Sequence, residues 1–146
     1  MENIGAERLR TLRTRLLSMA ATRSDRRVTE ELARADARKW HYAVLATLAE
    51  LGPASQAQLS ERTGIYRSDL VAVITELTER DQVTRAPDPA DRRRNLIELT
   101  AAGRRQLRRL DQILAAVDDE IFAPLSAEQR EQLSALLTLM LDAPAP

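Results

Sequence analysis

The sequence predicts a mainly α-helical fold with one short β-hairpin, and three observations support this fold class. Apolar residues recur at steps of three and four through most of the 146 residues, which is the spacing of helices with one buried face. Two short runs, 82–85 and 96–99, are instead typical of strands, with the turn residues Pro87-Asp88-Pro89 between them. With one Trp, two Tyr and one Phe, the core is expected to be aliphatic.

Two long helical segments are predicted in the first part of the chain. Residues 6 to about 34 are expected to form one long or once-interrupted helix. A second helix is expected over Lys39–Leu51, and Gly52-Pro53 ends it. The inner face of this second helix is expected to carry Tyr42, Leu45, Leu48 and Ala49.

Two shorter helices follow. The pattern Ser55-Gln56-Ala57-Gln58 is a capping box, which predicts a helix that starts there and ends near Gly64. After a three-residue turn, Ser68 to Arg80 is expected to form another helix. Its inward residues are Leu70, Val73, Ile74 and Leu77. Two short helices around a Gly-containing turn are typical of a helix-turn-helix, and an ordinary helical hairpin is the alternative.

The two strands behind this helix pair would form a wing. The predicted fold class is therefore mainly α, a winged helix-turn-helix with a short β-hairpin wing and further helices on both sides. Thr100-Ala101-Ala102-Gly103 opens the next helix, Pro124 breaks it, and Ser126 caps the last helix. The apolar steps of 3, 4, 3, 4 in the first of these helices indicate a coiled-coil seam, at Leu107, Leu110, Leu114, Val117 and Ile121.

The composition excludes several classes of function. Without Cys there is no disulfide, thiolate metal site or thiol redox chemistry, and one His cannot build a histidine metal site alone. Four Gly without a glycine-rich phosphate loop leave little basis for an enzyme or a bound cofactor. No apolar run is long enough for a bilayer, and residues 1–20 interleave Arg with Leu, so no membrane association and a cytoplasmic location are expected.

The net charge of zero argues mildly against a polyanionic partner, but its distribution is uneven. Residues 111–146 hold one basic and seven acidic side chains, which leaves residues 1–110 with a net charge of +6. We expect modest non-specific affinity for nucleic acid from this pattern.

The sequence resembles the multiple-antibiotic-resistance regulator (MarR) family of winged-helix transcription factors. The most specific match is a spaced motif that begins at Asp91. Arg93 follows after one residue, Leu99-Thr100 after five more, and Gly103 after a further two. Tyr42-Ala43-Val44-Leu45, 60–65 and Arg67-Ser68 also agree with the family pattern. The resemblance implies dimerisation helices at 1–36 and 101–142, a DNA-binding region at 37–100 and a tail at 143–146.

The sequence departs from the family pattern at two places. Asp81 stands where Gly is common before the first wing strand, and Asp can also adopt the left-handed conformation. Asp69, Val71 and Ala72 replace residues that are often polar in the family, so base recognition cannot be transferred from relatives.

The wing and the second short helix hold the predicted DNA-binding residues. The resemblance favours Arg93 as the arginine that enters the minor groove, with Asp91 holding the loop in shape by pairing with it or a neighbour. Strand alternation predicts that Arg92 and Arg94 point away from Arg93. A solvated charge run is the alternative.

In the major groove, Arg67 is expected to read guanine, and Ala72 a thymine methyl. Ser68 would cap the helix or reach a phosphate. Asp69 would accept from cytosine, cap the helix or pair with Arg67. Tyr66, at the start of the same helix, is also among the predicted DNA-binding residues. Phosphate contacts or capping alone are expected of Ser55, Gln56 and Gln58.

Two further surfaces are predicted. Trp40, His41 and Tyr42 lie beside cations, and the resemblance implies that a small aromatic or anionic effector binds there. The alternative is that Trp40 and Tyr42 anchor the core and His41 lies at the surface or is hydrogen-bonded. The homodimer interface is expected to contain Leu9, Leu12, Leu16, Leu107, Leu110, Leu114, Val117, Ile121, Leu133, Leu137 and Met140, with a long monomeric helix as the alternative.

The sequence thus predicts a homodimeric DNA-binding regulator, which represses palindromic operators in double-stranded DNA and is released by an effector. A winged-helix protein that binds another protein without sequence-specific DNA binding is the alternative, and the neutral total charge supports it.

Overall fold

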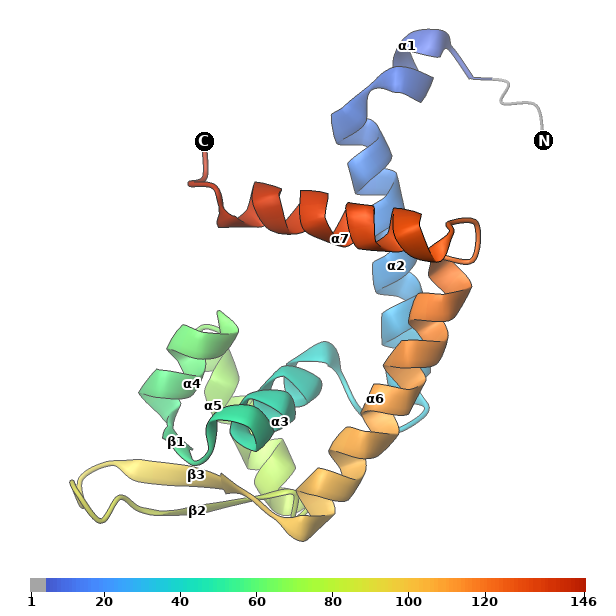
Figure 1. Cartoon of the computed structure of the whole chain (residues 1–146). Coiled ribbons are helices and arrows are strands. Elements are labelled where there is room, and N and C mark those ends of the chain that lie inside the picture. Colours follow the sequence, from blue (N-terminus) through green and yellow to red (C-terminus); the bar gives the residue numbers. More distant parts are fainter. Residues whose placement is uncertain (1–4) are drawn as a thin grey trace.

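The computed structural model describes residues 5–146 and has a small winged lobe joined to a set of further helices, three of them long (Figure 1). The lobe contains α3 (Lys39–Leu51), β1 (Ala54–Ser55), α4 (Gln56–Thr63), α5 (Arg67–Glu79), β2 (Val83–Pro87) and β3 (Asn95–Leu99). Outside it lie α1 (Glu7–Thr11), α2 (Arg13–Ala33), α6 (Ala101–Ile121) and α7 (Ala127–Asp142). The predicted mainly helical fold with a winged helix-turn-helix is confirmed, including the single interruption of the first long helix, at Leu12.

The sheet is antiparallel and has the order β1-β3-β2. The predicted hairpin is confirmed, with Val83 opposite Leu99 and Pro87 opposite Asn95. Pro87, which was predicted to lie in the turn, is the last residue of β2. The two-residue strand β1, where Ala54 pairs with Ile97, was not predicted because two residues carry no periodicity.

The core of the lobe is aliphatic, as predicted. Leu45 of α3, Leu70 and Ile74 of α5 and Ile97 of β3 are fully buried in one cluster. Burial of one face of α5 leaves the opposite face, which includes Arg67 and Val71, exposed to solvent.

A close approach joins the wing to α6. Thr100 caps α6 by accepting the Gly103 N–H at 3.0 Å, and its hydroxyl donates to the Asp81 carbonyl at 2.6 Å. A side chain at Gly103 would place its Cβ 2.1 Å from the Gln82 carbonyl oxygen, so this position requires glycine. Asp81 has a φ of 56°, which confirms the expected left-handed conformation.

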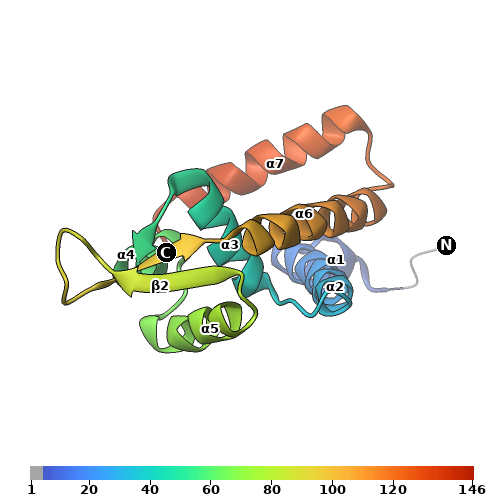
Figure 2. The same cartoon turned by 90° about the horizontal axis from the view of Figure 1, so that it is seen from below.

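The apolar seam of α6 faces its own chain. Leu110 is fully buried and Val117 is 4% exposed, while Leu107 and Leu114 pack partly against the core. In both views α2 and α6 lie side by side, and Arg27 of α2 donates to Glu120 of α6 at 2.9 Å (Figures 1 and 2). Leu110 belongs to the intrachain core and Val117 is buried outside that cluster, so neither presents an exposed side chain to a second copy.

Helix α7 extends away from α6 and leaves apolar residues in solvent (Figure 1). Along α7, which the structure describes in full, no residue is buried. Exposed apolar side chains lie on α7 at Leu136, Leu139, Met140 and Leu141, and on α1, α2 and the residue between them at Leu9, Leu12, Leu16, Leu17 and Met19. Within residues 5–146, no helix is both long and apolar enough to cross a lipid bilayer.

Candidate nucleic-acid interface

The α4–turn–α5 unit is held by local hydrogen bonds. Gly64 ends α4 in the left-handed conformation with a φ of 74°, and the Ser60 hydroxyl donates to the Ile65 carbonyl across the turn at 2.6 Å. These contacts fix the direction in which α5 leaves the turn. The first residue of α5, Arg67, therefore borders a groove that wing residues also line.

Helix α5 begins one residue earlier than predicted. Its N-cap is Tyr66, whose side chain is 78% exposed, and Arg67 is its first residue. The predicted capping roles of Ser68 and Asp69 are therefore wrong, because both lie inside the first turn. The Asp69 carboxylate instead lies near the helix N-terminus, where the helix dipole favours a negative charge.

The residues that start α4 are already engaged with each other. Ser55 is buried, its Oγ accepts the Gln58 N–H at 3.2 Å, and the Gln58 Oε1 accepts the Ser55 N–H at 3.0 Å. The predicted capping box is confirmed. Gln56 and Ser55 both line a groove beside the wing, and Gln56 takes no part in the capping box.

Two aspartates shape the wing loop. Asp88 Oδ1 accepts the Ala90 N–H at 2.9 Å, and Asp91 Oδ1 accepts the Arg93 N–H at 3.1 Å. Asp91 also pairs with the Arg93 guanidinium at 3.3 Å, as predicted. The Asp88 carboxylate lies 3.6 Å from the Arg94 guanidinium. The carboxylates thus order a loop that holds three consecutive arginines.

These arginines lie in the loop before β3 and not in a strand. The expected alternation of Arg92 and Arg94 against Arg93 therefore does not apply. The Arg93 side chain is 92% exposed, and Arg94 is half exposed. Both border the same groove, of about 300 Å³, between the wing and the starts of α4 and α5.

The groove brings together residues that are far apart in the sequence. Its lining consists of Ser55, Gln56, Ala57, Arg67, Val71, Arg93, Arg94 and Asn95. Three guanidinium groups thus border one surface, which can accept phosphates and the edges of bases. Val71 was missed as a site residue, although it follows Arg67 by one helical turn and so shares its face. Ser68 and Ala72 are exposed on α5, outside the groove lining.

The three rings predicted to bind an effector point to different surroundings. Trp40 is 42% exposed and borders a hollow of about 410 Å³ with Thr29, Arg38 and Lys39. The Tyr42 hydroxyl donates to Asp111 at 2.7 Å, and this bond and partial burial raise the pKa of Tyr42 to about 12. His41 is buried and hydrogen-bonded. The single pocket expected for Trp40, His41 and Tyr42 is therefore reduced to Trp40 and its cationic neighbours.

The fold and this cationic surface define a winged helix-turn-helix protein. Residues 34–94 match the MarR family profile. HosA, a transcriptional regulator of Escherichia coli O111:H-, is 32% identical over 108 residues, which cover 74% of this chain and 80% of HosA. The chain belongs to the MarR family of transcriptional regulators.

Two further comparisons agree with this assignment. The HTH-type transcriptional repressor NicR of Pseudomonas putida is 30% identical over 101 residues, which cover 69% of this chain and 64% of NicR. The solved structure of BpsR from Bordetella bronchiseptica, whose DNA binding is regulated by 6-hydroxynicotinic acid, has a TM-score of 0.83 and 25% identity. That match covers 96% of this chain and 100% of BpsR.

Proposed function

We propose that this protein is a homodimeric repressor that binds palindromic operator DNA through α5 and the wing. The observation that carries the proposal is the groove where Arg67, Arg93 and Arg94 meet. The N-terminal turn of α5 would enter the major groove with Arg67 and Val71 against base edges, and Arg93 would reach the adjacent minor groove. Arg92, Tyr66, Ser68 and Gln56 would flank these contacts.

The exposed apolar faces of α1, α2 and α7 support homodimerisation. Surfaces of this kind are costly in water and mark interfaces with other chains. Residues 1–36 and 101–142 would thus hold two copies together, and residues 37–100 of each copy would bind one half-site. Two-fold symmetry then calls for half-sites roughly 10 base pairs apart, or one helical turn.

The hollow beside Trp40 supports an anionic aromatic effector. Arg38 and Lys39 supply positive charge, and the exposed indole supplies a face for stacking. Regulation of BpsR by 6-hydroxynicotinic acid gives an example of this ligand chemistry in a protein of similar fold. An effector would release DNA if it binds more tightly to a spacing of the two lobes that does not fit the operator.

The DNA proposal is tested by Arg93→Ala, with Arg23→Ala on α2 as the control of equal charge change. We expect Arg93→Ala to weaken binding to the protein's own promoter DNA at least tenfold in fluorescence anisotropy, with an unchanged circular dichroism spectrum. Arg23→Ala should bind within about twofold of wild type. Equal affinity of the two variants would refute the placement of Arg93 in the DNA interface.

Salt dependence separates this function from that of a winged-helix module that binds protein. Phosphate contacts release counterions, so affinity for DNA should fall steeply between about 50 and 200 mM salt. If wild-type protein shows no retardation of promoter DNA even at low salt, the protein-binding alternative is favoured.

A further inference from the structure

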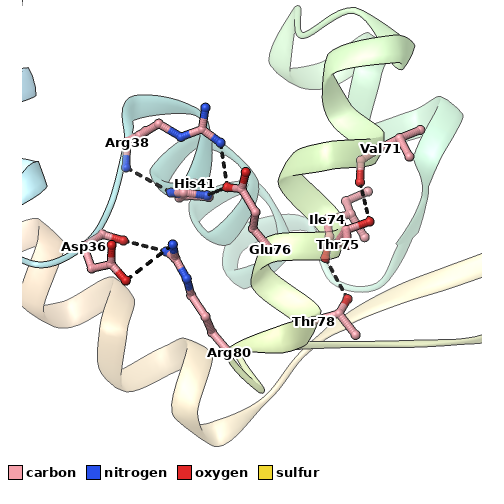
Figure 3. Close-up of polar contacts among 9 residues, drawn as sticks. All are labelled: Asp36, Arg38, His41, Val71, Ile74, Thr75, Glu76, Thr78 and Arg80. Atoms are coloured by element: carbon pink, nitrogen blue, oxygen red, sulfur yellow. Dashed lines mark hydrogen bonds and ion pairs between the residues drawn. The ribbon is translucent and has the colours of Figure 1, made fainter.

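A polar cluster joins the start of α3 to the last turn of α5 (Figure 3). His41 Nε2 lies 2.5 Å from Glu76 Oε2, and the Arg38 guanidinium donates to the same oxygen at 2.6 Å. On the other side of the imidazole ring, Nδ1 accepts the Arg38 backbone N–H at 3.0 Å. We call Arg38, His41 and Glu76 the α3–α5 clamp.

These contacts determine the protonation of the clamp. Because Nδ1 accepts a hydrogen bond, the proton of a neutral His41 lies on Nε2 and is donated to Glu76. Partial burial raises the pKa of Glu76, but the hydrogen bonds from His41 and Arg38 outweigh it, and the net pKa lies below its ordinary value. The clamp therefore consists of a carboxylate that accepts from a neutral imidazole and a guanidinium.

The position of the clamp links two regions of the fold. Glu76 lies on the same helix as Arg67 and Val71. Arg38 is the N-cap of α3 and His41 lies in its first turn, directly after the turn that follows α2. A second pair supports this link, since Arg80, one turn after Glu76, donates to the Asp36 carbonyl at 2.5 Å. His41 is only 2% exposed, whereas the Glu76 side chain is 35% exposed, so the imidazole side of this hydrogen bond is buried.

We propose that the α3–α5 clamp positions the recognition helix α5 relative to the junction of α2 and α3, and that operator affinity depends on this contact. Arg38, His41 and Glu76 act as positioning residues and touch no DNA. This inference rests on the proposed DNA-binding function. It adds to that function a defined connection between the helices that flank the lobe and the helix that reads DNA.

Glu76→Gln is the informative substitution, and Glu79→Gln is its matched control on the same helix. Both variants remove one negative charge from α5, and general electrostatics predicts that each would bind a polyanion slightly more tightly. Glu79 is exposed, and it takes no part in the hydrogen bonds that make up the clamp. If the clamp orients α5, Glu76→Gln should instead weaken DNA binding by about tenfold. The reason is that a hydrogen-bonded charge is lost from the contact that orients the helix.

Promoter DNA affinity and hydrogen exchange of the DNA-free protein are measured for wild type and both variants. We expect Glu76→Gln to lose affinity and to exchange the amides of α5 and the first turn of α3 faster than Glu79→Gln does, with the dimer mass retained. Equal exchange in the two variants, or a gain in affinity in both, would overturn the clamp. If wild-type protein does not bind DNA but exchange still depends on Glu76, the DNA-binding proposal fails, while the mechanical link between α3 and α5 is supported.

Discussion

Single side chains set the backbone of the proposed DNA surface. Asp88 and Asp91 order the wing loop from within, and Ser55 with Gln58 closes the first turn of α4. Because each acceptor binds a backbone N–H a few residues away, such contacts can be predicted from local sequence. The capping box was predicted on this basis, whereas the pairing of Asp91 with Arg93 or a neighbour was implied by the resemblance to the MarR family.

His41 gives the protein a predictable response to pH. Burial lowers the pKa of His41 from its ordinary value of 6.5, the bond to Glu76 opposes this effect, and the cations Arg80 and Arg38 add to it. Asp36 is the remaining charged residue around this site. Below pH 6.5 the unfolded chain binds a proton more readily than the folded chain, so the free energy of unfolding should decrease as the pH falls through the lowered pKa.

Urea unfolding at pH 7.5 and 5.0 measures this decrease, with His41→Gln as the comparison. Gln can donate to Glu76 but does not titrate, so the variant should lose less stability on acidification than wild type. An identical pH profile for wild type and His41→Gln would show that His41 does not contribute to the response.

The burial of His41 could not be predicted from the sequence. Its position next to Trp40 and Tyr42 indicated a shared aromatic site, but consecutive residues on a helix point in directions about 100° apart. The structure turns His41 into the lobe, Tyr42 toward α6 and Trp40 toward solvent. The partners that fix these directions lie 35 and 69 residues away.

At the scale of elements, helix periodicity and turn residues were sufficient to predict most of the fold. Helix α3 has the expected bounds, and the two expected strands pair in a hairpin. The seam of α6 shows the limit of this approach. A 3-4 repeat indicates that a helix is covered along one face, but it does not distinguish α2 of the same chain from a second copy.

The joint between the wing and α6 can be tested by Gly103→Ala. The added Cβ would meet the Gln82 carbonyl, so the helix or the strand must move, and we expect a loss of about 1–3 kcal/mol in the free energy of unfolding. Ala101→Ser, on the exposed start of the same helix, should change stability by less than about 0.5 kcal/mol. Chemical denaturation measures both, and equal stabilities would contradict the close approach.

At the scale of the whole molecule, the apolar faces outside the lobe predict the oligomeric state. Leu139 of α7 is 70% exposed, and a charge there would be buried unpaired if α7 meets a second copy. We expect Leu139→Glu to shift the mass measured by light scattering at micromolar concentration from twice 16.4 kDa toward 16.4 kDa. Operator affinity should fall with it, because the second half-site is no longer bound by a linked lobe.

Leu51→Glu is the matched control for this experiment. Leu51 is 60% exposed at the end of α3, inside the winged lobe, so the same substitution there should leave the mass unchanged. A monomeric wild type, or a dimer that survives Leu139→Glu, would remove α7 from the proposed interface.

The contacts of Thr100 and Gly103 fix the start of α6 to the base of the wing, so a tilt of α6 also moves the wing. The helix runs for 21 residues from the base of the wing, which corresponds to about 32 Å. A tilt of about 5° at its far end would therefore carry the wing base sideways by roughly 3 Å, close to the rise of one base pair. A small change in the angles between the long helices would therefore displace the wing by about the rise of one base pair.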